Sequence, residues 1–389
     1  MTSGNAADGI FLSFIVPVYN AAKTMKRCLD SIVIQMDAIG EPYEIICVDD
    51  GSTDDSSRML DDYAIGHEAL SVIHIANGGP SRARERGMAL AKGRYIAFAD
   101  SDDYYAAGRL TRIVEQLRGH EGYGVYVFGY LERNKPEGDF KERWPSDSIE
   151  GALPLSDFLG TYSKPENISL MNYLFNKVYR ADIAKSVNFD FSVSLGEDAL
   201  YNYACYASCD DVFASRTSAY IYENYSASSL SRGKGLDYVW RAYRTILEAI
   251  KPLLAGYGLG ERLWLLQRSY AISALHDYIR KRDSTGQDRH AAKEILTYMC
   301  AEGRSWPLDG VGAFDVLLMR CVRMGGVPLG LLLCEAKRLL RRQTVTELVD
   351  VKEVTGIHVN ENRADDSSAI PSRACRPRWC GGATVYSAD

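Results

Sequence analysis

The sequence predicts an α/β protein in which a mostly parallel sheet is flanked by helices and followed by a C-terminal helical appendage. Short apolar runs alternate with helical patterns over the first part of the chain, at the interval of βαβ units. Polar clusters stand directly after three of these runs, where parallel sheets bind their ligands. From residue 238 to residue 300 the apolar positions follow a helical period.

Local signals define the individual elements. The first apolar run is short and typical of a strand buried on both faces. A capping box at 52–55 opens a helix, while Pro80 and Gly93 stand where a later helix should begin and end. The expected strands are 11–16, 43–48, 70–75, 95–99 and 125–131, and the expected helices are 21–35, 52–63 and 80–93.

Four segments are expected along the chain. Residues 1–10 and 345–389 are small or polar, so both are predicted to be disordered. Residues 11–232 should form the sheet domain, and residues 233–344 a helical region. Within the sheet domain, the irregular and polar segment 133–175 is expected to be a loop or surface flap.

Composition excludes several classes of protein. A net charge of −6 argues against a nucleic-acid partner. The nine cysteines are odd in number and scattered without a CxxC pair, which favours reduced thiols in a cytoplasm. The N-terminus lacks the basic region of a signal peptide, and no stretch of about 18 uninterrupted apolar residues predicts a membrane span.

The sharpest chemical feature is the aspartate cluster 100–103, which follows the fourth expected strand. Two carboxylates separated by one residue on such a turn can hold Mg²⁺ or Mn²⁺, which would bridge a diphosphate and neutralise a leaving group. On spacing alone, a solvated aspartate-rich turn explains the cluster equally well. An EF-hand is excluded, because Tyr105 occupies the position that needs glycine.

A second signal, Asp49-Asp50-Gly51-Ser52, follows the second expected strand. Gly51 permits a tight turn, and an aspartate at a strand end can accept a hydrogen bond from a base or a ribose hydroxyl. Taken alone, a βα turn with helix-capping aspartates is the simpler interpretation. No G-x-G-x-x-G follows the first strand, so the usual dinucleotide site is not expected.

Together these segments resemble the family 2 glycosyltransferases of the GT-A fold, over residues 12–232. Any one segment is a weak match, whereas five in order at family-like spacing are a strong one. The matching segments are I-V-P-V-Y-N at 15–20, V-D-D-G-S-T-D at 48–54, G-R-Y-I-A-F-A-D-S-D-D at 93–103, N-K-V-Y-R at 176–180 and G-E-D at 196–198.

The resemblance implies an inverting transferase that moves a sugar from a UDP-sugar or another nucleotide sugar to an acceptor hydroxyl. It implies that Asp198 is the catalytic base, with Glu197 beside it. The chemistry agrees, because inversion needs one carboxylate to take the acceptor proton, and repulsion from Glu197 would raise the pKa of Asp198. Without the other motifs, this pair would be an acidic helix start favoured by the helix dipole.

The resemblance also implies donor and metal residues. Asp100 and Asp102 match the family's D-x-D, with Asp102 the better ligand for Mn²⁺ or Mg²⁺. Asp103 is an alternative ligand, because this run can be aligned one residue later. The residues expected around the donor are Pro17, Tyr19 and Asn20 at the nucleotide, Asp50 at the base, and Arg84 and Asp100.

Two positions depart from the family pattern. Glu85 stands where many relatives carry asparagine, at a donor-side contact. Glu223 stands where many carry arginine, which removes one positive charge from the pocket unless Arg232 or Lys234 replaces it. The segment 228–231 still resembles the family's loop over the diphosphate.

The segment 313–342 combines apolar residues with six basic ones. It would either lie on an anionic membrane, where lipid-linked acceptors reside, or form a two-helix cap on the catalytic domain. Under the first interpretation, the protein is a cytoplasmic enzyme on the inner face of the plasma membrane. It would use a carbohydrate or lipid-linked acceptor to build surface or extracellular polysaccharide.

Two other functions stay open. A sugar-phosphate nucleotidyltransferase would need a glycine-rich basic loop after the first strand, which residues 18–21 do not supply. A catalytically silent nucleotide-binding scaffold is favoured by Glu85 and Glu223, and it is opposed by the intact carboxylates of the aspartate motifs.

Overall fold

The computed structural model describes residues 9–145, 150–193, 195–224, 234–281, 284–303 and 306–355. The chain divides into two compact units, Met1–Arg338 and Leu339–Asp389. The sheet, its helices and both sites described below lie in the first unit.

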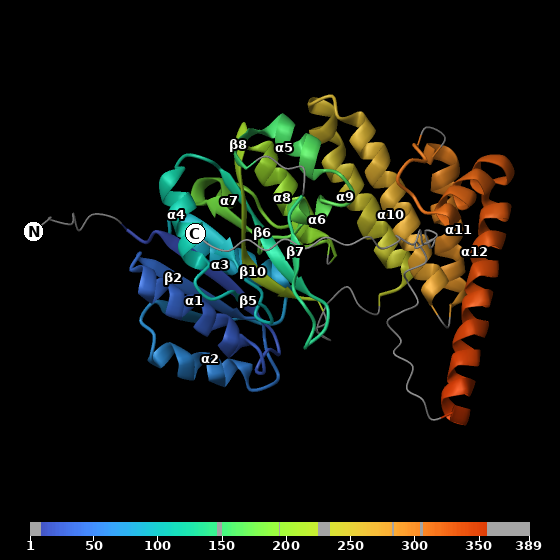
Figure 1. Cartoon of the computed structure of the whole chain (residues 1–389). Coiled ribbons are helices and arrows are strands. Elements are labelled where there is room, and N and C mark those ends of the chain that lie inside the picture. The colour runs from blue at the N-terminus through green and yellow to red at the C-terminus, as the bar shows by residue number, and fades with distance from the viewer. Residues whose placement is uncertain are drawn as a thin grey trace, which may run out of the picture. The chain divides into compact units, whose positions relative to one another are not determined.

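In the described part of the chain, ten strands form one mixed sheet (Figure 1). They are β1 (Leu12–Val18), β2 (Tyr43–Asp49), β3 (Leu70–His74), β4 (Tyr95–Phe98), β5 (Tyr104–Tyr105), β6 (Val125–Arg133), β7 (Lys141–Arg143), β8 (Gly151–Pro154), β9 (Lys177–Arg180) and β10 (Asp211–Glu223). The main order is β3-β2-β1-β4-β9-β6-β10-β5. The pairs β1–β2, β2–β3, β1–β4 and β6–β10 are parallel, whereas β9 pairs antiparallel with β4 and β6.

The expected α/β class and its mostly parallel sheet are confirmed. The five expected strands appear as β1, β2, β3, β4 and β6. The later strands were not expected, because their sequences lack a continuous apolar run. β10, for example, carries the polar stretch 215–218 in its middle, where its register with β6 shifts.

Residues 133–175 are more ordered than the expected loop or flap. Besides β7 and β8, they contain the helices α5 (Leu155–Tyr162) and α6 (Ile168–Asn172). α5 buries Phe158 and Tyr162 in the core, and β8 pairs antiparallel with β10. The sequence did not predict α5, because scattered prolines and polar residues surround this short apolar helix.

Helices flank the sheet (Figure 1). α1 (Met25–Ile39) and α4 (Leu110–Gly119) pack against each other, α2 (Ser56–Ile65) packs beside β3, and α3 (Pro80–Leu90) packs on β1 and β2. A side chain at Gly87 would place its Cβ 2.7 Å from Cγ2 of Ile15, so glycine allows α3 to approach β1 closely. That approach sets the position of Arg84, which α3 carries.

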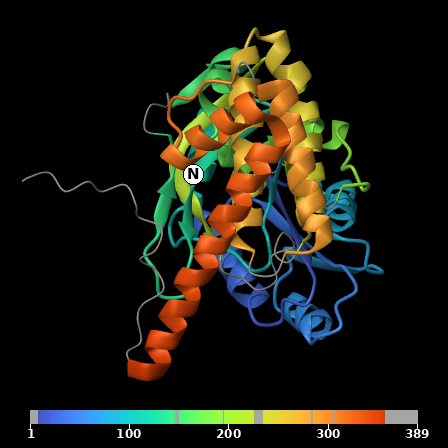
Figure 2. The ribbon, with the colours of Figure 1, turned by 90° about the vertical axis from the view of Figure 1, so that its right-hand side faces the viewer.

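The helical region follows the predicted periodicity. α9 (Leu236–Gly256), α10 (Gly260–Arg280) and α11 (Gly286–Glu302) pack side by side (Figure 2). They share a second hydrophobic core with α12 (Ala313–Thr355), to which Trp240, Leu275, Leu296, Leu318 and Leu331 belong. The packing of Leu318 and Leu331 favours the cap interpretation for the first part of α12.

α12 continues to Thr355, so its last turns extend past residue 345, where disorder was expected. Residues 356–389 lie outside the described residues. Within α12, Gly326 has φ 64° and ψ −156°, which interrupts the helix. The prediction of an ordered helical region up to residue 344 therefore underestimates the length of this helix.

One part of α12, Ala313–Arg341, is long and apolar enough to cross a membrane by length and composition. Arg320 and Arg323 interrupt its apolar residues, so the sequence contains no continuous apolar run that would predict a membrane span. Of its most apolar 18-residue stretch, 33% is buried within the protein. The break at Gly326 lies inside this part, so it is not one continuous helix.

Candidate active site

Asn20 ties together the loops that follow β1 and β2. Its backbone is left-handed, with φ 50°, and its Oδ1 accepts hydrogen bonds from the backbone N–H groups of Thr53 (2.8 Å) and Asp54 (3.2 Å). Asparagine tolerates this conformation better than most residues. The residue expected at the nucleotide thus holds two loops together, while Tyr19 beside it is exposed and Pro17 is partly buried in β1.

Asp50 fixes the start of α3. Its Oδ1 accepts the backbone N–H of Gly78 at 2.7 Å, and its Oδ2 accepts that of Gly79 at 2.8 Å. The carboxylate is buried. The predicted contact with a nucleotide base would therefore have to use the remaining lone pairs of a group that already supports a helix N-terminus.

Asp100 and Asp102 lie on the turn that follows β4, and both are partly exposed. The backbone N–H of Asp100 donates to the Tyr220 hydroxyl at 2.9 Å. The backbone carbonyl of Asp102 accepts a hydrogen bond from Nη2 of Arg27 at 2.8 Å. Contacts from β10 and α1 therefore hold the D-x-D turn on both sides.

Asp103, the alternative metal ligand, faces the interior. It is 1% exposed, and its Oδ1 accepts the backbone N–H of Glu223 at 2.8 Å. Burial, together with the charges of Asp100 and Asp102, raises the pKa of Asp103 well above its usual value. This carboxyl therefore joins the turn to β10.

Arg84 connects the aspartate turn to the expected base. Arg84 is 5% exposed; its Nη2 lies 2.9 Å from Oδ1 of Asp100, and its Nη1 lies 2.9 Å from Oδ1 of Asp198. Glu197 lies 3.7 Å from the same Nη1. Burial alone would lower the pKa of Arg84, but the three carboxylates outweigh it and raise that pKa. The sequence placed Arg84 at the donor and did not reveal this double contact.

Asp198 lies in the first turn of α8 (Glu197–Ala207). This helix begins directly after Gly196, whose left-handed φ of 88° permits the chain to turn into the helix. The Asp198 side chain is 23% exposed. Burial raises the pKa of Asp198 to about 7; Arg84 opposes this shift, and Glu197 adds to it. The expected effect of Glu197 is thus present, but burial is the larger cause.

Lys177, from the N-K-V-Y-R segment, is a buried amine beneath this site. Its Nζ donates to the carbonyl of Leu170 and to Oδ1 of Asn176, each at 2.8 Å. Burial lowers the pKa of Lys177 well below its usual value, and the nearby Asp198 carboxylate partly opposes that shift. The motif lysine therefore fixes the chain between α6 and β9, near the base.

Glu223, which stands where many relatives carry arginine, pairs with two arginines from other elements. The buried Glu223 carboxylate accepts hydrogen bonds from Nη1 (3.1 Å) and Nη2 (2.8 Å) of Arg27, and it also pairs with Arg133. Arg27 lies over the ring of Tyr104, 4.3 Å from its centroid. Two arginines from α1 and β6 thus balance the Glu223 carboxylate, and Arg27 also contacts the D-x-D turn.

Arg232 and the segment 228–231 fall outside the described residues, and Lys234 lies 5.2 Å above the ring of Tyr238. Glu85 is half-buried, and burial raises its pKa while Arg82 lowers it.

The mixed sheet, the aspartate turn after β4 and the acidic start of α8 define a GT-A glycosyltransferase domain. Residues 13–187 match the model of glycosyl transferase family 2, so this part of the chain is similar to that family. S. aureus TarS, solved as residues 1–349 in complex with UDP-GlcNAc, has the same fold. The TM-score is 0.62 over 85% of this chain and 92% of that chain, at 21% sequence identity.

Two relatives are similar in sequence. EpsJ, an uncharacterized glycosyltransferase of Bacillus subtilis, is 28% identical over 213 residues, which cover 54% of this chain and 60% of EpsJ. The poly(ribitol-phosphate) beta-glucosyltransferase of Bacillus spizizenii is 31% identical over 220 residues, 54% of this chain and 32% of that protein. This chain therefore matches less than two thirds of the length of either relative.

Proposed function

We propose that this chain is an inverting glycosyltransferase that moves a sugar from a nucleotide sugar, in the first place a UDP-sugar, to an acceptor hydroxyl. The observation that carries the proposal is the Arg84 guanidinium, which contacts both Asp100 of the D-x-D turn and Asp198. The complex of TarS with UDP-GlcNAc supports a uridine nucleotide as the donor.

Asp100 and Asp102 are the residues that would hold Mn²⁺ or Mg²⁺. Two partly exposed carboxylates fit such an ion, because it usually takes one or two carboxylates and completes its shell with phosphate oxygens and water. Among the described residues, no group of three or more His, Cys, Asp or Glu side chains forms a closed metal cage. When bound, the ion would neutralise the charge of the leaving diphosphate.

In this proposal, Asp198 is the general base. As the acceptor oxygen bonds to the anomeric carbon, its proton passes to the Asp198 carboxylate, and the bond from that carbon to the diphosphate oxygen breaks. The bond forms on the side opposite the leaving group, so the configuration inverts. A pKa near 7 makes Asp198 a stronger base than an ordinary aspartate, and Arg84 orients its carboxylate.

Incubating the protein with a panel of nucleotide sugars, without acceptor, tests this proposal. We expect slow hydrolysis of a UDP-sugar that requires a divalent ion and releases UDP. The scaffold alternative predicts instead that a nucleotide binds while no member of the panel is hydrolysed or transferred. A nucleotidyltransferase would form a nucleotide sugar and pyrophosphate from a sugar phosphate and a nucleoside triphosphate.

The pH dependence of transfer gives a prediction about Arg84. We expect kcat/KM to rise with pH along a limb near pH 7, because only deprotonated Asp198 accepts a proton. Lys177 and Arg84 favour the charged form of Asp198, whereas Glu197 and Asp100 disfavour it. Replacing Arg84→Gln removes the larger favourable charge, so the limb should move to higher pH.

The matched control for this shift is Arg82→Gln, an exposed arginine two positions earlier on α3. That variant should keep the parental limb. A limb that stays in place in Arg84→Gln would show that Asp198 is not the group whose titration controls the rate.

We infer an acceptor in surface or extracellular polysaccharide, either a carbohydrate or a lipid-linked chain. The poly(ribitol-phosphate) beta-glucosyltransferase and the minor teichoic acid biosynthesis protein GgaA of Bacillus subtilis, 25% identical over 193 residues, support this class. The place of action would then be the cytoplasm, at the inner face of the plasma membrane.

The first part of α12 offers a test of membrane association. Met324 and Leu332 are 78% and 66% exposed. Replacing both with serine should reduce cosedimentation with anionic vesicles by about tenfold or more, since burying one such side chain stabilises by about 1.5–3 kcal/mol. Deleting α12 would be less informative, because Leu318 belongs to the second core.

Ile65→Ser on α2, another exposed apolar position, is the control for the loss of a surface apolar side chain. If the α12 variant sediments with vesicles as well as the parent does, the membrane interpretation is excluded and the packed cap is preferred.

A further inference from the structure

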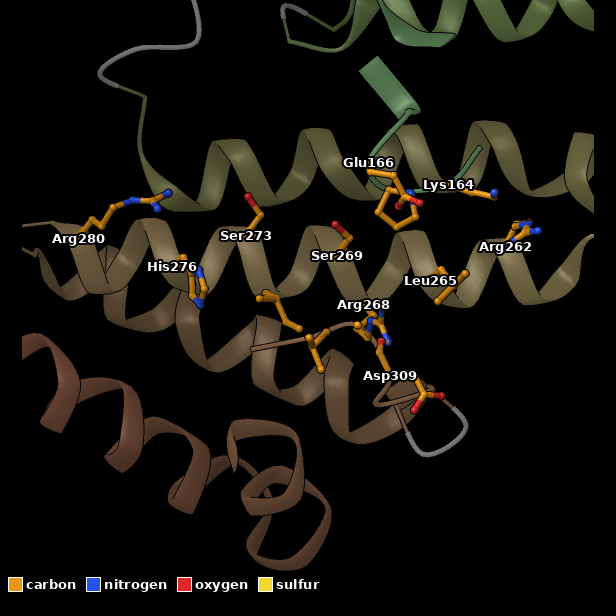
Figure 3. A pocket seen from close by; sticks show the side chains of 14 residues that line it. Lys164, Glu166, Arg262, Leu265, Arg268, Ser269, Ser273, His276, Arg280 and Asp309 are labelled. Carbon is orange, nitrogen blue, oxygen red and sulfur yellow. The ribbon is translucent and has the colours of Figure 1, made fainter. Parts of the chain in front are cut away.

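A cavity of about 760 Å³ lies along α10 and shares no lining residue with the Arg84 site. Figure 3 shows Arg262, Ser269, Ser273, His276 and Arg280 along α10, together with Lys164 and Glu166 from the loop after α5 and Asp309 from the loop before α12. Its volume lies within the range of about 300–1,000 Å³ that is usual for ligand pockets. We call this cavity the α10 groove.

The helical period explains the stripe of polar side chains on α10. Arg262, Ser269, Ser273, His276 and Arg280 follow one another at intervals of three, four or seven residues, so they lie on one face of the helix. Other positions of α10, among them Ala271, Leu275 and Ile279, enter the second core. Core packing therefore fixes α10 with its basic and hydroxyl face toward the groove.

Most of the charged side chains in the α10 groove already have partners. Nη1 of Arg268 donates to the backbone carbonyl of Asp309 at 3.1 Å, Arg280 pairs with Asp277 at 2.5 Å, and His276 pairs with Asp315 at 2.7 Å.

Arg262 differs from these groups. No described residue forms an ion pair or a side-chain hydrogen bond with Arg262, and its Nε is buried without a partner. A buried polar atom without a partner is unfavourable, so Arg262 is the groove's strongest candidate for binding an anion.

We propose that the α10 groove binds the phosphodiester backbone of an anionic, hydroxyl-bearing acceptor chain, a proposal that rests on the proposed transferase function. A guanidinium forms charge-assisted hydrogen bonds with phosphate oxygens, and the serine hydroxyls beside it suit polyol hydroxyl groups. A neutral polysaccharide would leave the Arg262 charge unpaired. The chemistry of the groove therefore favours a phosphate-containing chain.

The groove is connected to the proposed base through side-chain hydrogen bonds. Nδ2 of Asn172, at the end of α6, donates to the hydroxyl of Tyr270 on α10 at 3.3 Å. The carbonyl of Asn172 accepts a hydrogen bond from Nδ2 of Asn202 at 2.8 Å, and Asn202 lies on α8, the helix that carries Asp198. These two hydrogen bonds link α10, which lines the groove, through α6 to α8, which carries the proposed base.

The test measures binding of a short poly(glycerol phosphate) oligomer to the full chain by calorimetry, without donor. Replacing Arg262→Gln should weaken this binding about 10- to 100-fold, because a hydrogen bond to a charged group is lost. Ser269→Asp, which adds a negative charge to the same face, should also weaken it. Arg241→Gln, at an exposed position on α9, is the matched control and should bind as the parent does.

Hydrolysis of a UDP-sugar without acceptor, measured in the same variants, separates this inference from the proposed function. We expect it to be unchanged in Arg262→Gln, while transfer to the oligomer requires a higher acceptor concentration. Equal oligomer binding by the parent and Arg262→Gln would overturn the inference, and the same holds if a neutral dextran oligomer binds as tightly. Arg262-dependent binding of anionic vesicles but not of the oligomer would also overturn it, in favour of lipid phosphates.

Discussion

Replacing Asp198 with asparagine is expected to lower the rate of sugar transfer by about 10²–10⁴-fold, the usual contribution of a positioned base. Asparagine keeps the shape of the side chain, and its amide oxygen can still accept the Arg84 hydrogen bond at 2.9 Å. It cannot accept a proton at neutral pH. Asp198 is not a proposed donor or metal ligand, so kcat should fall while the donor Kd, measured by calorimetry, stays close to the parental value.

Glu197→Gln is the matched control, because Glu197 is the neighbouring acid at the start of α8 and also faces Arg84. Its proposed influence on the reaction is electrostatic, so its replacement should lower kcat much less. If Glu197→Gln is the more damaging change, the two carboxylates must exchange roles. A parental transfer rate in Asp198→Asn would exclude Asp198 as the base.

The sequence predicted the parallel part of the sheet because buried parallel strands have a direct signature. β1, β2 and β4 are covered on both faces, so almost every residue in them is apolar and the runs are visible without alignment. β9 gives no such signal, since only four residues insert it antiparallel between β4 and β6. Its place depends on pairing with distant strands, which local patterns do not encode.

The sequence predicted which residues belong to the candidate site, but it did not predict the contacts that several of their side chains make. Asp100 and Asp198 each contact the Arg84 guanidinium, which is separated from Asp198 by 114 positions in the chain. The contact depends on the close approach of α3 to β1 at Gly87. Asn20 and Asp50 bind backbone amides of neighbouring loops, a role that motif matching cannot separate from ligand binding.

Glu223 shows that comparing a single sequence position with relatives does not predict the charge of the folded site. The sequence indicated the loss of one positive charge, because glutamate stands where relatives carry arginine. In the fold, Glu223 instead accepts hydrogen bonds from Arg27 and Arg133, which come from α1 and β6. Arg27 also donates to the backbone carbonyl of Asp102, so Glu223 is linked through Arg27 to the D-x-D turn.

Replacing Asp102 with asparagine is expected to weaken divalent-dependent binding of UDP by about tenfold or more. A hard cation prefers charged oxygen ligands, and this change removes one of the two carboxylates that would hold it. The backbone carbonyl that accepts the Arg27 hydrogen bond is retained, so the turn itself should keep its place. The measurement is UDP affinity at a series of Mn²⁺ concentrations, with thermal unfolding as the test for an intact fold.

Asp103→Asn provides the matched control, because it changes the neighbouring carboxyl on the same turn. Asparagine keeps the shape of the Asp103 side chain, and its amide oxygen can still accept the N–H of Glu223 at 2.8 Å. We therefore expect parental metal-dependent binding in Asp103→Asn and a loss in Asp102→Asn. Equal losses in the two variants would include Asp103 among the ligands, whereas UDP binding that resists a chelator in the parent would exclude a metal from donor binding.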